Sequence, residues 1–360
     1  MKLKQTDFSF AAPAAGLLTA LCIILLTSRY PLSAAAAFFT APFGSIYYFG
    51  SWLNTASFLI IAGTGAAFAV QSGNMNLGGE GQIYAGGFAA AATMNVLLPA
   101  NSVQSVQSMQ NAAFAEPSAM SIALVSCAAL AASVTVSAAA AFIPAVLKLK
   151  RGISELISSF LLSAAVIPLI DYAVSGPLRD QSKNLLALPL IHGSLRFKPL
   201  LEPSPLNMSV FFVVPAVLCS ALFLYKTRSG QRFRICGSAP EFALYCAYPV
   251  RTVSAAGMAV SGALHGLAGY AAVAGTYYTC HSGFYAGMGW NALSAALIAR
   301  SNPLLLVPVS LFLAYIFTGT SSPSVAAQTS YDLAFLVQAA VMLFISASFI
   351  PKAAKREKAI

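Results

Sequence analysis

Residues 63–91 read GTGAAFAVQSGNMNLGGEGQIYAGGFAAA, a stretch of small residues that holds two asparagines, two glutamines and a single carboxylate. Helices in lipid gain little from burying apolar side chains against one another, so close contact between them relies on small residues. Glycine at this density also permits broken helices whose backbone faces a cavity. A second glycine-rich stretch covers residues 257–275. Both stretches predict a tightly packed bundle of membrane helices with helix breaks.

The overall composition agrees with a membrane protein. The chain has 360 residues, of which 58% are hydrophobic and 8% are charged. An ordinary globular domain is about 45–50% apolar and about 25% charged. So few charges cannot cover a soluble body of this size. The composition therefore excludes a soluble enzyme, a disordered protein and a nucleic-acid-binding module.

Ten apolar stretches approach the length of a membrane span, about 17–25 residues. The first is longer than the core of a signal peptide, about 7–15 residues, and no clear small-x-small cleavage site follows it, so we interpret it as a retained span. We predict an all-α polytopic protein of ten transmembrane helices, in one domain over residues 1–360. The spans are 11–28, 52–72, 76–99, 118–147, 154–174, 208–225, 251–275, 286–300, 303–320 and 331–350.

The basic residues predict the orientation of these spans, because cytoplasmic loops are enriched in lysine and arginine. Residues 29–51 are apolar but contain Pro31, Pro42 and Gly44. If this segment lies at the interface or is re-entrant, 15 of the 20 basic residues fall on the inner side. If it spanned, the richest basic clusters would lie outside. We therefore expect both termini in the cytoplasm.

Two loops and an internal repeat follow from this topology. Residues 175–207 form an outer loop, residues 226–250 an inner loop, and residues 351–360 a basic cytoplasmic tail. Spans 2–5 and 7–10 run in opposite senses, and each set contains a Gly-x-Gly break, at 79–81 and at 287–289. Inverted repeats with broken helices are typical of transporters. The sequence therefore predicts an inverted repeat.

The chain lacks the motifs of an enzyme. A phosphate-binding loop requires a Gly-Lys pair, and none occurs. The three histidines and six cysteines form no nucleophile or metal constellation. We expect no catalytic residue, no metal and no cofactor, and any ATP hydrolysis must occur on a separate subunit.

Residues 76–82, Asn-Leu-Gly-Gly-Glu-Gly-Gln, resemble the hallmark of the permease subunits of bacterial ABC importers for nucleosides and simple sugars, a family with ribose-type and branched-chain amino acid permease-like members. Other blocks agree with that family in the same order, so that the resemblance covers roughly residues 50–320. These blocks are 153–162 with 175–180, 236–250 with 261–269, and 287–304.

The resemblance implies the function and the partners. It implies a permease of the bacterial inner membrane that works by alternating access, with ABC ATPase subunits, a second identical or different permease, and a substrate-binding lipoprotein or periplasmic protein. Nucleosides are the expected substrates, with simple sugars as the alternative. A secondary transporter driven by an ion gradient, with Glu80 or His265 as proton site, is the rival from another class.

Polar side chains inside the predicted spans are candidates for the substrate pathway or gate, because such groups are costly in a membrane and are often functional. Glu80 begins a helix, where the positive end of the dipole stabilises a carboxylate. The alternative is structural: Glu80 organises the glycine break, and the histidine only bonds to a neighbouring helix. The candidates are Asn76, Glu80, Gln82 and His265.

Within the inner loop, the resemblance implies a short helix that docks into a groove on the ATPase. The matching positions are Gly237, Pro240, Glu241, Ala243 and Tyr245. Ser238 and Ala239 depart from the Glu-Asn or Gly-Asn type pair of relatives. The alternative is that the arginines of this loop anchor it to anionic lipid.

Overall fold

The computed structural model describes residues 7–99 and 117–321, with residues 336, 339, 340 and 343. Over this part of the chain the regular structure is helical and forms no β-strand, which confirms the all-α class. The α-helices are α1 Asp7–Thr27, α2 Pro31–Gly44, α3 Ile46–Gln71, α4 Gly79–Leu97, α5 Ala119–Arg151, α6 Glu155–Ser175, α7 Val213–Lys226, α8 Arg228–Ser238, α9 Pro240–Tyr245, α10 Val250–Ala271, α11 Met288–Ile298 and α12 Pro303–Thr320. Short helical turns are η2 Gly193–Leu195, η3 Met208–Phe212 and the π-helix η4 Ala272–Tyr277.

A multi-span membrane fold is confirmed, although not the number ten. Six segments in the described ranges are long and apolar enough to cross a membrane. The predicted span 331–350 and the tail 351–360 lie outside these ranges. The six are Ile46–Gln71, Ala119–Arg151, Glu155–Ser175, Met208–Lys226, Val250–Tyr277 and Pro303–Thr320.

The segment 29–51 contains the whole of α2 and the first residues of α3. Pro31 occupies the first turn of α2, whose 14 residues are fewer than a span requires. Ser45 then has extended backbone and caps α3 by accepting a hydrogen bond from the Tyr48 N–H. As a result α3 begins at Ile46, earlier than the predicted span start at residue 52. A serine cap between two apolar stretches is invisible to hydropathy, which explains the difference.

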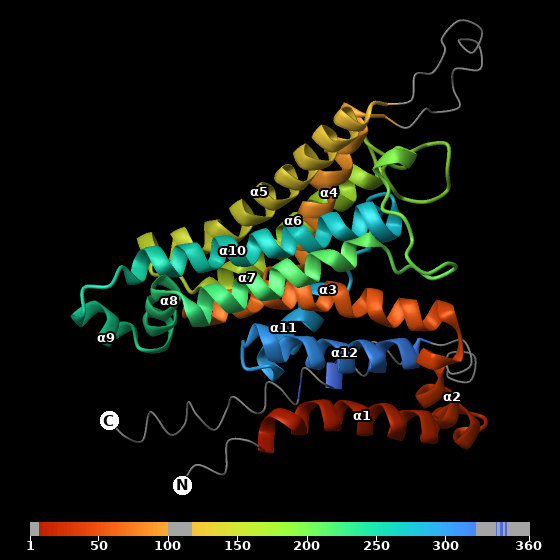
Figure 1. The fold of residues 1–360 in the computed structure, drawn as a ribbon, viewed down its shortest axis with the longest axis horizontal. Coiled ribbons are helices and arrows are strands. Elements are labelled where there is room, and N and C mark those ends of the chain that lie inside the picture. Colours follow the sequence, from red (N-terminus) through yellow and green to blue (C-terminus); the bar gives the residue numbers. More distant parts are fainter. Residues whose placement is uncertain (1–6, 100–116, 322–335, 337–338, 341–342, 344–360) are drawn as a thin grey trace, which may run out of the picture.

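Helix α3 is the axis of the bundle. It is apolar on all faces, and 83% of its most apolar 18-residue stretch is buried, as expected for a helix surrounded by others. One set of its side chains joins a core with α4, α10 and η4, and another joins a core with α1, α11 and α12. Figure 1 shows α5 and α10 on one side of α3 and α11, α12 and α1 on the other. The two halves of the molecule therefore meet along α3.

The two ends of the bundle differ. Residues 176–207 lie at one end, where Gly50 near the start of α3 packs against Ser204 and Leu206. At the other end, α8 and α9 project beyond the spans (Figure 1), and Gly237 of α8 packs against residues 71 and 73. We call these the loop end and the α9 end.

Small residues allow α10 to pack closely on α4 and α5. A Cβ added at Gly266 would lie 2.5 Å from the Ser133 carbonyl oxygen, and one at Gly269 would collide with the Ile83 carbonyl oxygen. The Ser133 hydroxyl donates to the Gly266 carbonyl oxygen at 2.7 Å. The glycine-rich stretch 257–275 thus has the packing role that the sequence predicted.

Gly269→Ala should lower the free energy of unfolding by about 1–3 kcal/mol, because overpacking would push α10 away from α4. Gly44→Ala is the matched control, since a Cβ there meets nothing within 4 Å. Thermal unfolding in detergent measures both. Equal melting temperatures for Gly269→Ala and the unmodified chain would show that this contact is not tight.

Candidate functional site

A cavity of about 940 Å³ lies beside α3. Its wall comes from α3, the first turn of α4, η4, the segment before α11, α11 itself and the end of α12, together with Pro205 and Ala339. Its aromatic lining residues are Tyr47, Tyr48, Phe58, Tyr277, Tyr285, Trp290 and Phe317. Its polar ones are Ser51, Asn54, Thr55, Glu80, Thr276, Asn291, Thr318 and Ser321.

The cavity extends from the loop end to the middle of the bundle. Tyr47, Ser51 and Pro205 line it near the loop end, whereas Glu80 and Trp290 line it where α4 and α11 begin. No lining residue comes from α8, α9 or residues 72–78. Within the described residues, the cavity therefore reaches only part of the way across the molecule.

Glu80 joins two helix N-termini. It lies in the first turn of α4, and its Oε1 accepts a hydrogen bond from the Gly287 N–H at 2.8 Å, immediately before α11. The Trp290 side chain, whose indole N–H can only donate, lies beside this carboxylate. The positive ends of both helix dipoles are thus directed at one negative charge, which stabilises it.

The close approach of α4 and α11 depends on glycine. A Cβ added at Gly79 would lie 3.2 Å from the Gly289 Cα, and one at Gly289 would lie 2.7 Å from the Glu80 Cγ. The two Gly-x-Gly breaks, 79–81 and 287–289, therefore meet at Glu80. The sequence predicted both breaks but not their contact.

The other three predicted pathway residues lie together behind α4, away from the cavity. Asn76, Gln82 and His265 are each 3% exposed or less. Asn76 Nδ2 donates to Gln82 Oε1 at 2.8 Å, and Gln82 Nε2 donates to Asn76 Oδ1 at 3.0 Å. His265 Nδ1 lies 2.7 Å from the same Gln82 oxygen, and Asn76 also donates to Ser261. This network ties α4 and the segment before it to α10.

Sequence reasoning missed a second carboxylate inside the bundle, whose hydrogen bonds support the cavity wall. Asp171 of α6 accepts hydrogen bonds from the Tyr84 and Ser282 hydroxyls, both at 2.7 Å. Tyr84 in turn packs against Tyr285, with ring centroids 4.5 Å apart, and Tyr285 lines the cavity. Asp171 falls inside the predicted span 154–174, so the rule that singled out Glu80 would also have found it.

The π-helix η4 supplies another part of the wall. Such wide turns occur frequently at functional sites. Asn54 of α3 donates to Thr276 Oγ1 of η4 at 3.1 Å, and Asn207 Nδ2 lies 3.4 Å from Asn54 Oδ1. These bonds connect α3, η4 and the loop end beside the cavity.

The predicted inner-loop residues lie on α8 and α9 at the α9 end. Ala243 is buried and fixes α9 to the bundle, whereas Tyr245 is 91% exposed. Pro240 and Glu241 are also exposed. Phe242 and Leu244, which the sequence did not single out, are more than half exposed beside them. Together α9 presents a small surface of apolar side chains and one carboxylate.

Comparison with known proteins now identifies the family. Residues 48–346 match the family described as branched-chain amino acid transport system, permease component. The chain belongs to this family. It is thus the permease subunit of an ABC importer in the inner membrane, with ATPase and substrate-binding partners, and is not itself an enzyme. No solved structure matches the chain.

Relatives of this permease carry different names. It is 34% identical to the probable riboflavin import permease protein RfuC of Treponema pallidum, over 96% of this chain and 87% of the relative. It is 28% identical to the glucose ABC transporter permease protein TsgB13 of Haloferax volcanii, over 94% and 88%. It is 25% identical to the guanosine ABC transporter permease protein NupP of Bacillus subtilis, over 92% and 90%.

Glu80→Ala should lower the free energy of unfolding by about 1–3 kcal/mol, because it leaves the Gly287 N–H without its acceptor. Glu80→Gln, the matched control, keeps an acceptor oxygen and should retain more of that stability. Melting temperatures of both variants in detergent test this. If the two variants had the same melting temperature, the charge alone and not the hydrogen bond would hold α11.

Proposed function

We propose that this permease imports nucleosides, and that its cavity suits any compound that joins a flat nitrogen heterocycle to a hydroxylated chain. The observation that supports the proposal is that the cavity is lined by both aromatic rings and amide side chains. Guanosine and riboflavin, named for two relatives, share this plan. Simple sugars, the alternative class, lack the heterocycle.

The aromatic side chains support the ring half of this substrate. Tyr285 and Trp290 lie on either side of the α11 N-terminus and both line the cavity. Aromatic faces stack on heterocycles, and each stacked base contributes about 1–3 kcal/mol where it has been measured. Asn54, Asn291 and Thr276 supply the donors and acceptors that hydroxyl groups require.

The proposed membrane topology has ten spans with both termini in the cytoplasm. Lys148, Lys226, Arg228 and Arg251 gather near the α9 end, which the positive-inside rule assigns to the cytoplasm. The loop end then faces outward, and residues 29–51 stay at the outer side. The meeting of the two Gly-x-Gly breaks at Glu80 supports the inverted repeat of spans 2–5 and 7–10, because equivalent elements of two repeats meet at a central site.

The mechanism that we propose is alternating access. A substrate-binding protein delivers the ligand at the loop end, and the cavity receives it with its partner permease, either a second copy or a different chain. ATPase subunits that close on ATP move α9, and this movement changes the side of the membrane to which the pathway is open. Glu80 then acts mainly as the link between α4 and α11 at the pathway wall, while Asn76, Gln82 and His265 support that link from behind.

Docking of α9 on the ATPase is supported by its shape and exposure. Ala243 is buried, whereas Phe242, Leu244 and Tyr245 stand free of the bundle. Two loop arginines already have aromatic partners: Arg232 lies 5.5 Å from the Tyr248 ring centroid and Arg234 lies 4.9 Å from that of Tyr225. Fewer arginines of this loop are therefore left to bind anionic lipid, as the alternative interpretation requires.

Glu241→Arg should abolish ATP-driven uptake while the protein still inserts, because it reverses a charge at the proposed docking surface. Gln231→Arg is the matched control, since it adds a positive charge to exposed α8 and should transport normally. Uptake per unit of inserted protein measures both. Normal uptake by Glu241→Arg would remove the docking role.

Cells that lack other nucleoside carriers and express the complete importer should take up labelled guanosine. Excess adenosine or riboflavin should compete, whereas glucose should not, because glucose has no heterocycle to stack in the cavity. An uncoupler added while ATP is maintained should leave uptake unchanged. Competition by glucose alone would instead assign the permease to simple sugars.

A further inference from the structure

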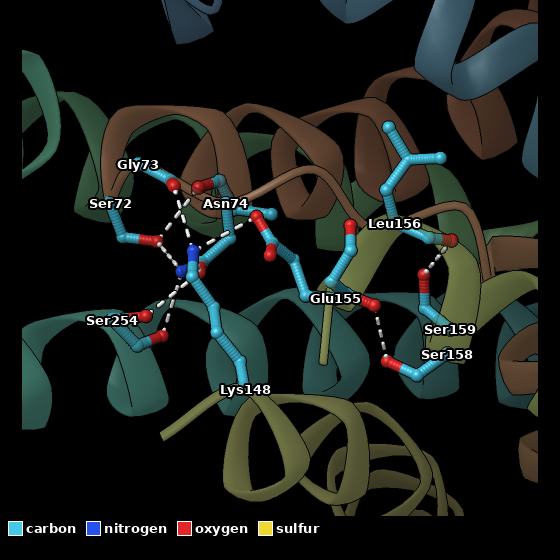
Figure 2. A network of polar contacts seen from close by, with 11 residues as sticks. Ser72, Gly73, Asn74, Lys148, Glu155, Leu156, Ser158, Ser159 and Ser254 are labelled. Atoms are coloured by element: carbon cyan, nitrogen blue, oxygen red, sulfur yellow. Dashed lines mark hydrogen bonds and ion pairs between the residues drawn. The ribbon is translucent and has the colours of Figure 1, made fainter. Parts of the chain in front are cut away.

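A polar network ties the α9 end together. Lys148 in the last turn of α5 pairs with Glu155 in the first turn of α6, with Nζ and Oε1 2.9 Å apart. The same Nζ donates to Asn74 Oδ1 at 2.9 Å and to the Gly73 carbonyl oxygen at 3.3 Å. Figure 2 shows Lys148 reaching all three of these partners. One ammonium group thus joins α5, α6 and the segment between α3 and α4.

Asn74 extends the network to α10. Its Nδ2 donates to Ser72 Oγ at 2.8 Å and to the Ser254 carbonyl oxygen at 2.9 Å. The Ser254 hydroxyl donates back to Asn74 Oδ1 at 2.8 Å (Figure 2). On the far side of the segment, the Leu77 N–H donates to Ser159 Oγ of α6 at 3.0 Å. Residues 72–78 are therefore attached to three different helices.

These attachments hold a segment that lacks helical bonds of its own. Residues 74–78 are neither helix nor strand. Ser72, Asn74 and Asn76 are nevertheless at most 4% exposed. The segment leads directly to Glu80 in the cavity wall, and its Gly73 contacts Gly237 of α8, so it lies between the cavity and the α9 end. Its side-chain contacts, rather than a backbone ladder, keep it there.

Helix α8 touches this segment directly. Gly237 packs so closely on Gln71 and Gly73 that a Cβ there would lie 2.7 Å from the Gly73 N. Phe233 of α8 packs on Phe68 of α3, with ring centroids 5.8 Å apart. A displacement of α8 therefore reaches residues 71–73 without passing through any other element.

We propose that residues 72–78 form the inner gate of the pathway and that Lys148, with Glu155 and Asn74, is the latch that holds this gate shut. Movement of α8 pulls at Gly73 and releases the latch. The proposal rests on the proposed function only in taking α9 as the element that moves α8. The latch itself is a property of this chain and needs no partner.

The test is the rate at which a thiol introduced into the gate reacts from the α9 side. In a chain whose six native cysteines are replaced by alanine, Met75→Cys reports on the gate and Ser51→Cys reports on the cavity. A membrane-impermeant maleimide is applied to inside-out vesicles that hold the permease without its ATPase subunits. Lys148→Met and Glu155→Gln should each raise the labelling rate of the gate thiol about tenfold, which corresponds to about 1.4 kcal/mol.

Lys150→Met is the matched control, because Lys150 lies on the same turn of α5 and is exposed. It should leave the labelling rate unchanged. Unchanged labelling of the gate thiol in both latch variants overturns the proposal. An equal rise at the cavity thiol, tested from the loop side, also overturns it, because it would mean general loosening. If Lys148→Met fails to insert, Glu155→Gln alone decides. Because no ATPase is present, a failed docking surface cannot produce either result.

Discussion

The hydrogen bonds of Glu80 hold the N-termini of α4 and α11 together in the middle of the bundle. A carboxylate at such depth is costly unless donors surround it. The Gly287 N–H, the Trp290 side chain and two helix dipoles supply that environment. The arrangement requires Gly79 and Gly289 to lack side chains. If this contact opened, Trp290 would lose its fixed place in the cavity wall, and α4 would lose its link to the second half of the molecule.

The same contact joins the two halves of the molecule that pack on opposite sides of α3. Helix α3 packs through apolar side chains on both sides, and such contacts have no directional preference. Directional bonds between elements gather instead at Glu80 in the centre, at Asn54 near the loop end, and at Asn74 near the α9 end. In the alternating-access mechanism proposed above, a change of access must break or remake some of these bonds, because apolar packing alone does not specify one arrangement.

The sequence predicted the helical class, six of the spans and the positions of the two glycine breaks. These follow from local composition, since hydropathy and glycine density are properties of neighbouring residues. It did not predict that Glu80 bonds to Gly287, more than 200 positions away, nor that Gln82 and His265 are hydrogen-bonded to each other behind α4. Such partners depend on how helices are placed in three dimensions. The boundary at Ser45 was also missed, because a capping serine leaves no hydropathy signal.

Framework and substrate recognition are separable in this permease. Glu80 bonds to a backbone N–H, and Gly79 and Gly289 act through the side chains that they lack, so the central contact does not depend on which ligand passes. The cavity wall is different, because Tyr285, Asn54 and Asn291 present side chains to the cavity. In the function proposed above, changes there alter recognition without disturbing the contact at Glu80. If recognition lies in the wall as proposed, the same helix contact is compatible with the different substrates for which the relatives are named, riboflavin, glucose and guanosine.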